Sequence, residues 1–86
     1  MSRKIPPVTL KFRKLGREGL RGYYDNEGDK ETKGPVIVLD PRLEGVELLD
    51  TLIHELLHHA LPDLDEAPVE RTATFIANSI WRIGGR

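Results

Sequence analysis

Residues 45–62 read GVELLDTLIHELLHHALP, and this stretch predicts an amphipathic helix. Its apolar residues recur at spacings of three and four, the period of a helix face that is buried against the rest of a protein. The residues of this face are Val46, Leu49, Leu52, Ile53, Leu56, Leu57 and Ala60. Pro62 ends the helix, because a proline inside a helix removes a backbone hydrogen bond and clashes with the preceding turn.

A second helix is predicted after a short turn at residues 63–65. Asp65 is a candidate N-cap, and Pro68 falls in the first helical turn, where its missing N–H leaves no helical bond unmade. Gly84 and Gly85 close the helical pattern. The apolar face of this helix is expected to comprise Val69, Ala73, Ile76, Ile80 and Ile83.

Three short segments upstream of the helices have strand patterns. Residues 8–13 (VTLKFR) alternate between apolar and polar, and residues 36–39 (VIVL) form a continuous apolar run. Residues 20–24 (LRGYY) are a weaker candidate because they contain a glycine, and the polar stretch 25–34 is typical of a loop. Three strands followed by two helices predict an α+β protein with a three-stranded, mainly antiparallel sheet, in one domain over residues 1–86.

The composition narrows the possible functions. The chain has 38% hydrophobic and 31% charged residues, which is typical of a soluble folded domain. Its formal charge of −1, from 13 basic and 14 acidic residues, argues against nucleic acid as the main partner. No apolar run approaches the length of about 18 residues that a membrane span needs, so we expect no membrane partner and a cytoplasmic location. Because the chain has no cysteine, a metal site must use nitrogen and oxygen ligands.

The first predicted helix contains the pentapeptide HELLH at residues 54–58. Residues four apart in a helix lie above one another, so the imidazoles of His54 and His58 can reach the same zinc ion. Glu55 lies about 100° further round the helix, where its carboxylate can hold and deprotonate a water molecule as the general base. This spacing is the H-E-x-x-H motif of zinc metallopeptidases. His59 points elsewhere and is expected to be a surface or capping residue.

A catalytic zinc site needs a third protein ligand, and here that ligand must be a carboxylate because no cysteine or later histidine exists. The candidates are Asp63, Asp65, Glu66 and Glu70. Helical phase puts Glu66 near the middle of the apolar face of the second helix and Glu70 toward its edge. A carboxylate on a buried face is unfavourable unless it is paired or bound to a metal, so we expect Glu66 to be the third ligand and Glu70 the alternative. Glu66 can also serve without a metal, at the positive end of the helix.

Residues 35–83 resemble the gluzincins, and they are similar to the small SprT-like and ImmA/IrrE-like metallopeptidases of phages and bacteria. The resemblance rests on the apolar strand 36–39, on TLIHELLH at residues 51–58 and on LDE at residues 64–66. It implies a minimal zincin-like fold that hydrolyses peptides or proteins, with zinc on His54, His58 and a downstream glutamate, and Glu55 as the base. It also implies that strand 36–39 is the sheet edge at which an extended peptide pairs. The third histidine usual in the SprT group is absent.

Other functions fit the same motif. A metal-stabilised binding or regulatory module would use these ligands for folding, without turnover, although Glu55 in the base position favours an enzyme. A zinc hydrolase that acts on bonds other than peptide bonds is a further alternative, and the near-neutral charge disfavours a nucleic-acid substrate. Tyr23 or Tyr24 can donate a hydrogen bond to an oxyanion, but tyrosines in strands more often serve packing. No pattern in the sequence indicates an oligomeric state.

Overall fold

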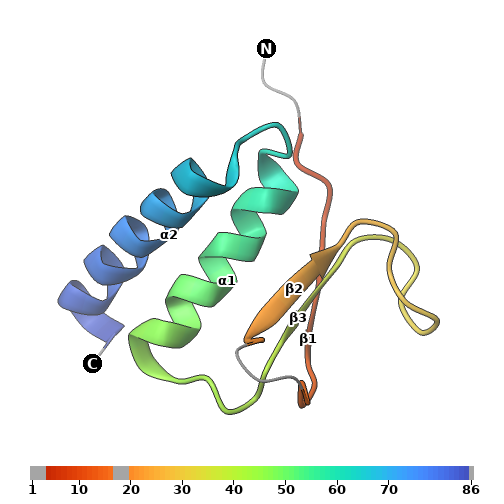
Figure 1. The fold of residues 1–86 in the computed structure, drawn as a ribbon, viewed down its shortest axis with the longest axis horizontal. Coiled ribbons are helices and arrows are strands. Elements are labelled where there is room, and N and C mark those ends of the chain that lie inside the picture. The colour runs from red at the N-terminus through yellow and green to blue at the C-terminus, as the bar shows by residue number, and fades with distance from the viewer. Residues whose placement is uncertain (1–3, 17–19, 86) are drawn as a thin grey trace.

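The computed structural model describes residues 4–16 and 20–85 of the chain. The strands are β1 (Thr9–Phe12), β2 (Gly22–Asp25) and β3 (Val36–Leu39). They are followed by α1 (Gly45–Ala60), α2 (Glu66–Ile80) and a short π-helical turn, η1 (Trp81–Gly85). The expected α+β order of three strands and then two helices is therefore confirmed (Figure 1).

The sheet is mixed, with the strand order β1-β3-β2. β3 runs antiparallel to β2, with Val38 opposite Tyr23, and parallel to β1, with Val38 opposite Lys11. The sheet that was expected to be mainly antiparallel is therefore only partly so, because one of its two pairings is parallel. The physical reason is that β3 inserts between the two earlier strands instead of adding to an edge.

This strand order also corrects the expectation that residues 36–39 form an edge. β3 is the central strand, and each of its four side chains is at most 2% exposed. Val36 and Val38 pack on one face of the sheet with Leu15 and Tyr23. The other face is covered by α1, which contacts both β2 and β3, and the side chains of Leu39 and Thr51 both lie close to Gly22. A strand that is buried on both faces has to be apolar throughout, as VIVL is.

The two helices lie on one side of the sheet, and only α1 is in contact with the strands. α1 packs against β2, β3 and α2, whereas α2 packs against α1 and η1 and lies on the side of α1 away from the strands (Figure 1). The buried residues of α2 are Val69, Ala73 and Ala77. The predicted face is therefore right at its beginning and wrong at its end, since Ile80 and Ile83 are exposed. Short side chains at spacings of four residues are enough to fill the contact of α2, because α2 packs against a helix and not against the sheet.

Asp40, directly after β3, fixes the chain at the end of the central strand. Its buried carboxylate accepts hydrogen bonds from the backbone N–H of Leu15 at 3.1 Å and from that of Arg42 at 2.9 Å. The Arg42 guanidinium also donates to it, from Nε at 2.8 Å and from NH2 at 2.6 Å. The Arg42 side chain and the backbone N–H groups hold the pKa of Asp40 well below its usual range.

We expect Asp40→Asn to lower the free energy of unfolding at neutral pH and to remove part of its dependence on acid. Because the folded-state pKa is depressed, the contribution of Asp40 is complete above its unfolded pKa of about 4 and is lost as the pH falls further. Urea unfolding of both proteins between neutral and strongly acidic pH measures this. An equal loss of stability in acid for the two proteins would contradict the assignment.

None of the helices in the two described stretches of the chain has both the length and the apolar character that crossing a membrane requires.

Candidate metal centre

The turn between the helices brings the start of α2 to the end of α1. His54 and His58 lie one turn apart on α1, and Glu66 is the first residue of α2. Their side chains converge: the two Nε2 atoms are 3.2 Å apart, and the Glu66 carboxylate oxygens lie 3.0 Å from Nε2 of His54 and 2.9 Å from Nε2 of His58. These three residues form a group that can hold a metal ion.

The two imidazoles present ring nitrogens to each other. The rings meet edge to face with centroids 4.8 Å apart, so both Nε2 atoms point into the space beside Glu66. Two nitrogen lone pairs at this distance repel unless a proton or a cation lies between them. With an ion bound by both Nε2 atoms, the ring protons would lie on Nδ1.

Of the four candidate carboxylates, the structure brings Glu66 to both histidines. Among the described residues, Asp63, Asp65 and Glu70 do not belong to this group. Glu66 was expected to be buried on the apolar face of α2, and this expectation is wrong, because its side chain is 61% exposed. Its place beside the imidazoles follows from the reversal of the chain after Pro62.

Glu55 lies beside the group and not within it. It is partly buried, and this burial raises its pKa above the usual glutamate value. The charges of His54 and His58 oppose the shift, while the charge of Glu66 adds to it. A carboxylate with a raised pKa accepts a proton more readily than a free one. Its role as a general base remains a prediction.

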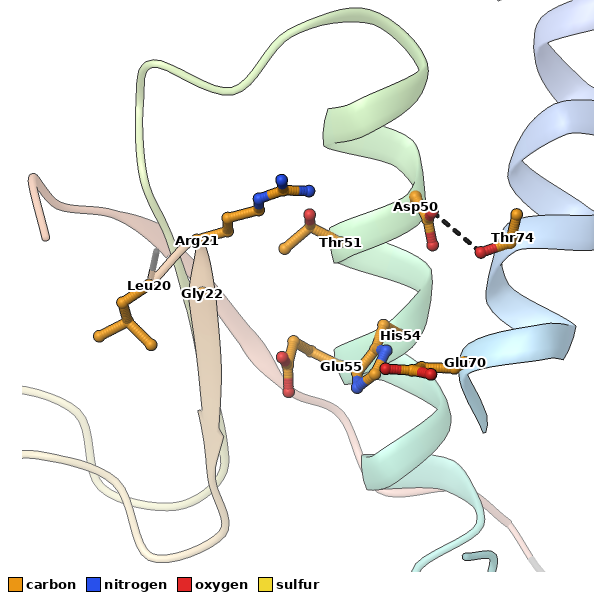
Figure 2. A pocket seen from close by; sticks show the side chains of 9 residues that line it. All are labelled: Leu20, Arg21, Gly22, Asp50, Thr51, His54, Glu55, Glu70 and Thr74. Carbon is orange, nitrogen blue, oxygen red and sulfur yellow. Dashed lines mark hydrogen bonds between the residues drawn. The ribbon is translucent and has the colours of Figure 1, made fainter. Parts of the chain in front are cut away.

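A pocket of about 420 Å³ opens over α1 next to these residues. Its lining residues are Leu20 and Arg21 just before β2, Gly22 at the start of β2, Asp50, Thr51, His54 and Glu55 from α1, and Glu70 and Thr74 from α2. Figure 2 shows Thr51 and Glu55 on the side of α1 that faces β2, and Asp50 and His54 on the side that faces α2. The pocket is thus a trough with α1 as its floor, β2 and α2 as its walls, and Glu55 and His54 in the middle.

Contacts on both sides fix the width of this trough. Thr74 Oγ1 donates a hydrogen bond of 3.0 Å to Asp50, which ties α2 to α1 (Figure 2). On the other side, a Cβ at Gly22 would lie 2.9 Å from the Val38 carbonyl oxygen and 3.2 Å from Cγ2 of Thr51. The glycine that weakens the strand pattern therefore lets β2 approach α1 closely.

His59 is buried, which contradicts the expectation of a surface or capping residue. Its side chain is turned away from the metal group, with Nδ1 2.9 Å from the hydroxyl of Tyr24 and Nε2 2.6 Å from the carbonyl oxygen of Pro6. The rotation of about 100° per residue accounts for the difference from His58, because it turns His59 toward the sheet and the N-terminal segment. No local sequence signal identifies these two distant partners.

Neither tyrosine of β2 is among the residues that line the pocket. The hydroxyl of Tyr24 bonds to His59, and the Tyr23 side chain packs on the opposite face of the sheet, where its hydroxyl contacts the Arg13 guanidinium. The structure thus gives both hydroxyls partners outside the trough.

Comparisons of this chain with protein-family models, curated proteins and solved structures found no match. The resemblance to gluzincins therefore remains a hypothesis that rests on the sequence of residues 36–39, 51–58 and 64–66.

Proposed function

We propose that this protein is a zinc-dependent hydrolase that cleaves peptide bonds. His54, His58 and Glu66 would hold the ion, and Glu55 would be the general base. The observation that carries the proposal is the convergence of two Nε2 atoms 3.2 Å apart, each within 3.0 Å of a different oxygen of the Glu66 carboxylate, beside an open trough that contains Glu55.

The spacing and the chemistry of the donors support zinc. Two atoms bound to one zinc ion at tetrahedral angles lie about 3.3–3.4 Å apart, for bond lengths of about 2.0–2.1 Å. The two Nε2 atoms are 3.2 Å apart, close to this value, and one donor atom from each of the three residues gives a set that lies within 4.8 Å of one another. Movements of the side chains alone would bring such a set to zinc-binding distances. Two imidazoles with one carboxylate are also a known ligand set for catalytic zinc.

The number of ligands favours an enzyme over a metal-stabilised module. Structural zinc sites are closed by four protein ligands, whereas catalytic sites use three and leave one position for water. Among the described residues, the group contains His54, His58 and Glu66 and no fourth histidine or carboxylate. The trough beside it gives a substrate access to this position.

The residues divide the work of hydrolysis. Bound zinc would supply a Lewis acid that activates water and polarises the carbonyl of the scissile bond. The Glu55 carboxylate would accept a proton from the attacking water and pass it to the amine that leaves as the C–N bond breaks. Its place in the trough beside His54 supports this role, because it would put the carboxylate next to the attacking water.

The free edge of β2 supports a peptide as the substrate. Among the described strands, β2 pairs with β3 on one side and with none on the other. Gly22 of β2 also lines the trough, so a peptide that paired with this edge would run past Glu55 and His54. Backbone pairing at a sheet edge binds extended chains with little regard to their side chains. We therefore propose that an extended peptide pairs with the free edge of β2 and not with residues 36–39, which lie inside the sheet.

A cleavage assay tests the proposal. Protein purified without chelator is incubated with a mixture of unstructured peptides, and the products are identified by mass spectrometry. We expect cleavage that a chelator stops and added zinc restores, and no cleavage by the His58→Ala variant. Cleavage that is equal in the variant would contradict the proposal. Zinc that raises the melting temperature of the wild type, with no cleavage, would support the metal-stabilised module instead.

A further inference from the structure

The positions of two of the three proposed ligands depend on the last turn of α1. His58 lies in its last turn, and Glu66 begins α2 only a short turn later. The last turn of a helix lacks partners for its carbonyl groups and is the part that frays most readily. Here the N–H of Leu61 donates to the carbonyl of Leu57 at 2.8 Å, and this bond closes the helix. A second restraint acts on the same turn through His59.

His59 is held at both ring nitrogens. A backbone carbonyl can only accept, so Nε2–H must donate to the oxygen of Pro6, 2.6 Å away. In a neutral ring, Nδ1 then accepts from the hydroxyl of Tyr24 at 2.9 Å. The rings of Tyr24 and His59 also meet edge to face, with centroids 5.3 Å apart. Both nitrogens of His59 are thus occupied, and the ring is not free to bind the ion that its neighbour would hold.

The two partners reach His59 from separate parts of the fold. Tyr24 belongs to β2, which forms one wall of the trough, and Pro6 belongs to the segment before β1. Figure 1 shows this segment passing the end of α1 where the chain turns toward α2. The contacts therefore tie the last turn of α1 to the sheet and to the N-terminal segment at one buried point.

We propose that His59 is the positioning residue of the metal centre, held by Tyr24 and Pro6 and acting through the last turn of α1. His58 and His59 share one helical turn, so fixing the direction of His59 also fixes the direction of His58. Metal ligands need supporting contacts of this kind, because displacements below 1 Å weaken a site. This inference rests on the metal site proposed above.

Two tyrosine variants make a matched test. Tyr24→Phe removes one hydroxyl that contacts His59, and Tyr23→Phe removes the neighbouring hydroxyl, which contacts Arg13 on the other face of the sheet. Zinc affinity is measured by competition with a chelating dye, and the coordination geometry by the visible absorption of the cobalt-substituted proteins. Both measurements are made at a temperature at which circular dichroism shows each protein to be fully folded.

We expect Tyr24→Phe to weaken zinc binding roughly tenfold and to shift the cobalt absorption bands. Tyr23→Phe should change neither. If Tyr24→Phe does not fold, His59→Asn carries the same test, because its shorter amide can still accept from Tyr24 but does not reach Pro6. We expect the zinc affinity of His59→Asn to lie between that of the wild type and the tenfold weaker affinity expected for Tyr24→Phe.

The outcomes separate this inference from the proposed function. Wild-type protein that binds zinc through His58, with the same affinity and the same cobalt spectrum in both tyrosine variants, would overturn the positioning role alone. A lower melting temperature of Tyr24→Phe with unchanged affinity would also overturn it, because the contact would then serve only stability. Wild-type protein that binds no zinc would overturn both.

Discussion

Replacing Glu55 with glutamine is expected to lower the rate of peptide hydrolysis by about 10²–10⁴-fold and to leave zinc binding nearly unchanged. Glutamine has the size of glutamate but cannot accept a proton from water. Glu55 does not belong to the group that would hold the ion, so its loss as a base should leave the ligands in place. The measurements are kcat on a peptide found in the cleavage assay, and the dissociation constant for zinc.

Glu44→Gln is the matched control for this prediction. Glu44 precedes α1, is exposed and makes no capping hydrogen bond, so the substitution removes the same charge away from the trough. Its kcat should stay near the wild-type value. A Glu55→Gln protein as active as the Glu44→Gln protein would show that Glu55 is not the base.

The second large effect is expected at the third ligand. Glu66→Gln should weaken zinc binding by roughly 100-fold or more, because it removes a charged ligand that lies within 3.0 Å of both imidazole nitrogens. Glu70→Gln should weaken it far less, since Glu70 lies one turn later on α2 and outside the group. Competition with a chelating dye measures both affinities under the same conditions.

The pair of variants is matched, because each removes one carboxylate from the same helix face near the same histidines. The order of the two effects decides the assignment. A larger loss for Glu70→Gln would make Glu70 the third ligand and would require α2 to rotate when the ion binds.

The local elements of the fold could be predicted from the sequence, whereas the order of the strands could not. Helical spacing and Pro62 place α1, because both act within a few residues. The pairing of β3 with both β1 and β2 depends on contacts between distant residues, about which a periodic pattern says nothing. One signal was available: the continuous apolar run at residues 36–39 is typical of a strand that is buried on both faces, and such a strand lies inside a sheet.

The candidate site shows the same division. The convergence of His54 and His58 follows from a spacing of four residues on one helix. Glu66 was predicted from burial, but its exposed side chain reaches the imidazoles because the chain reverses after α1. The contacts of His59 with Tyr24 and Pro6 join residues 35 and 53 positions apart, so helical phase gave only the direction of its ring and not its partners.

The most direct test of the central claim is a crystal structure, with anomalous scattering at the zinc absorption edge, of protein purified without chelator. The account predicts one zinc ion bound by Nε2 of His54, Nε2 of His58 and the carboxylate of Glu66, with water as the remaining ligand. A zinc ion closed by a fourth protein ligand, or the absence of zinc from this group in zinc-saturated protein, would contradict it.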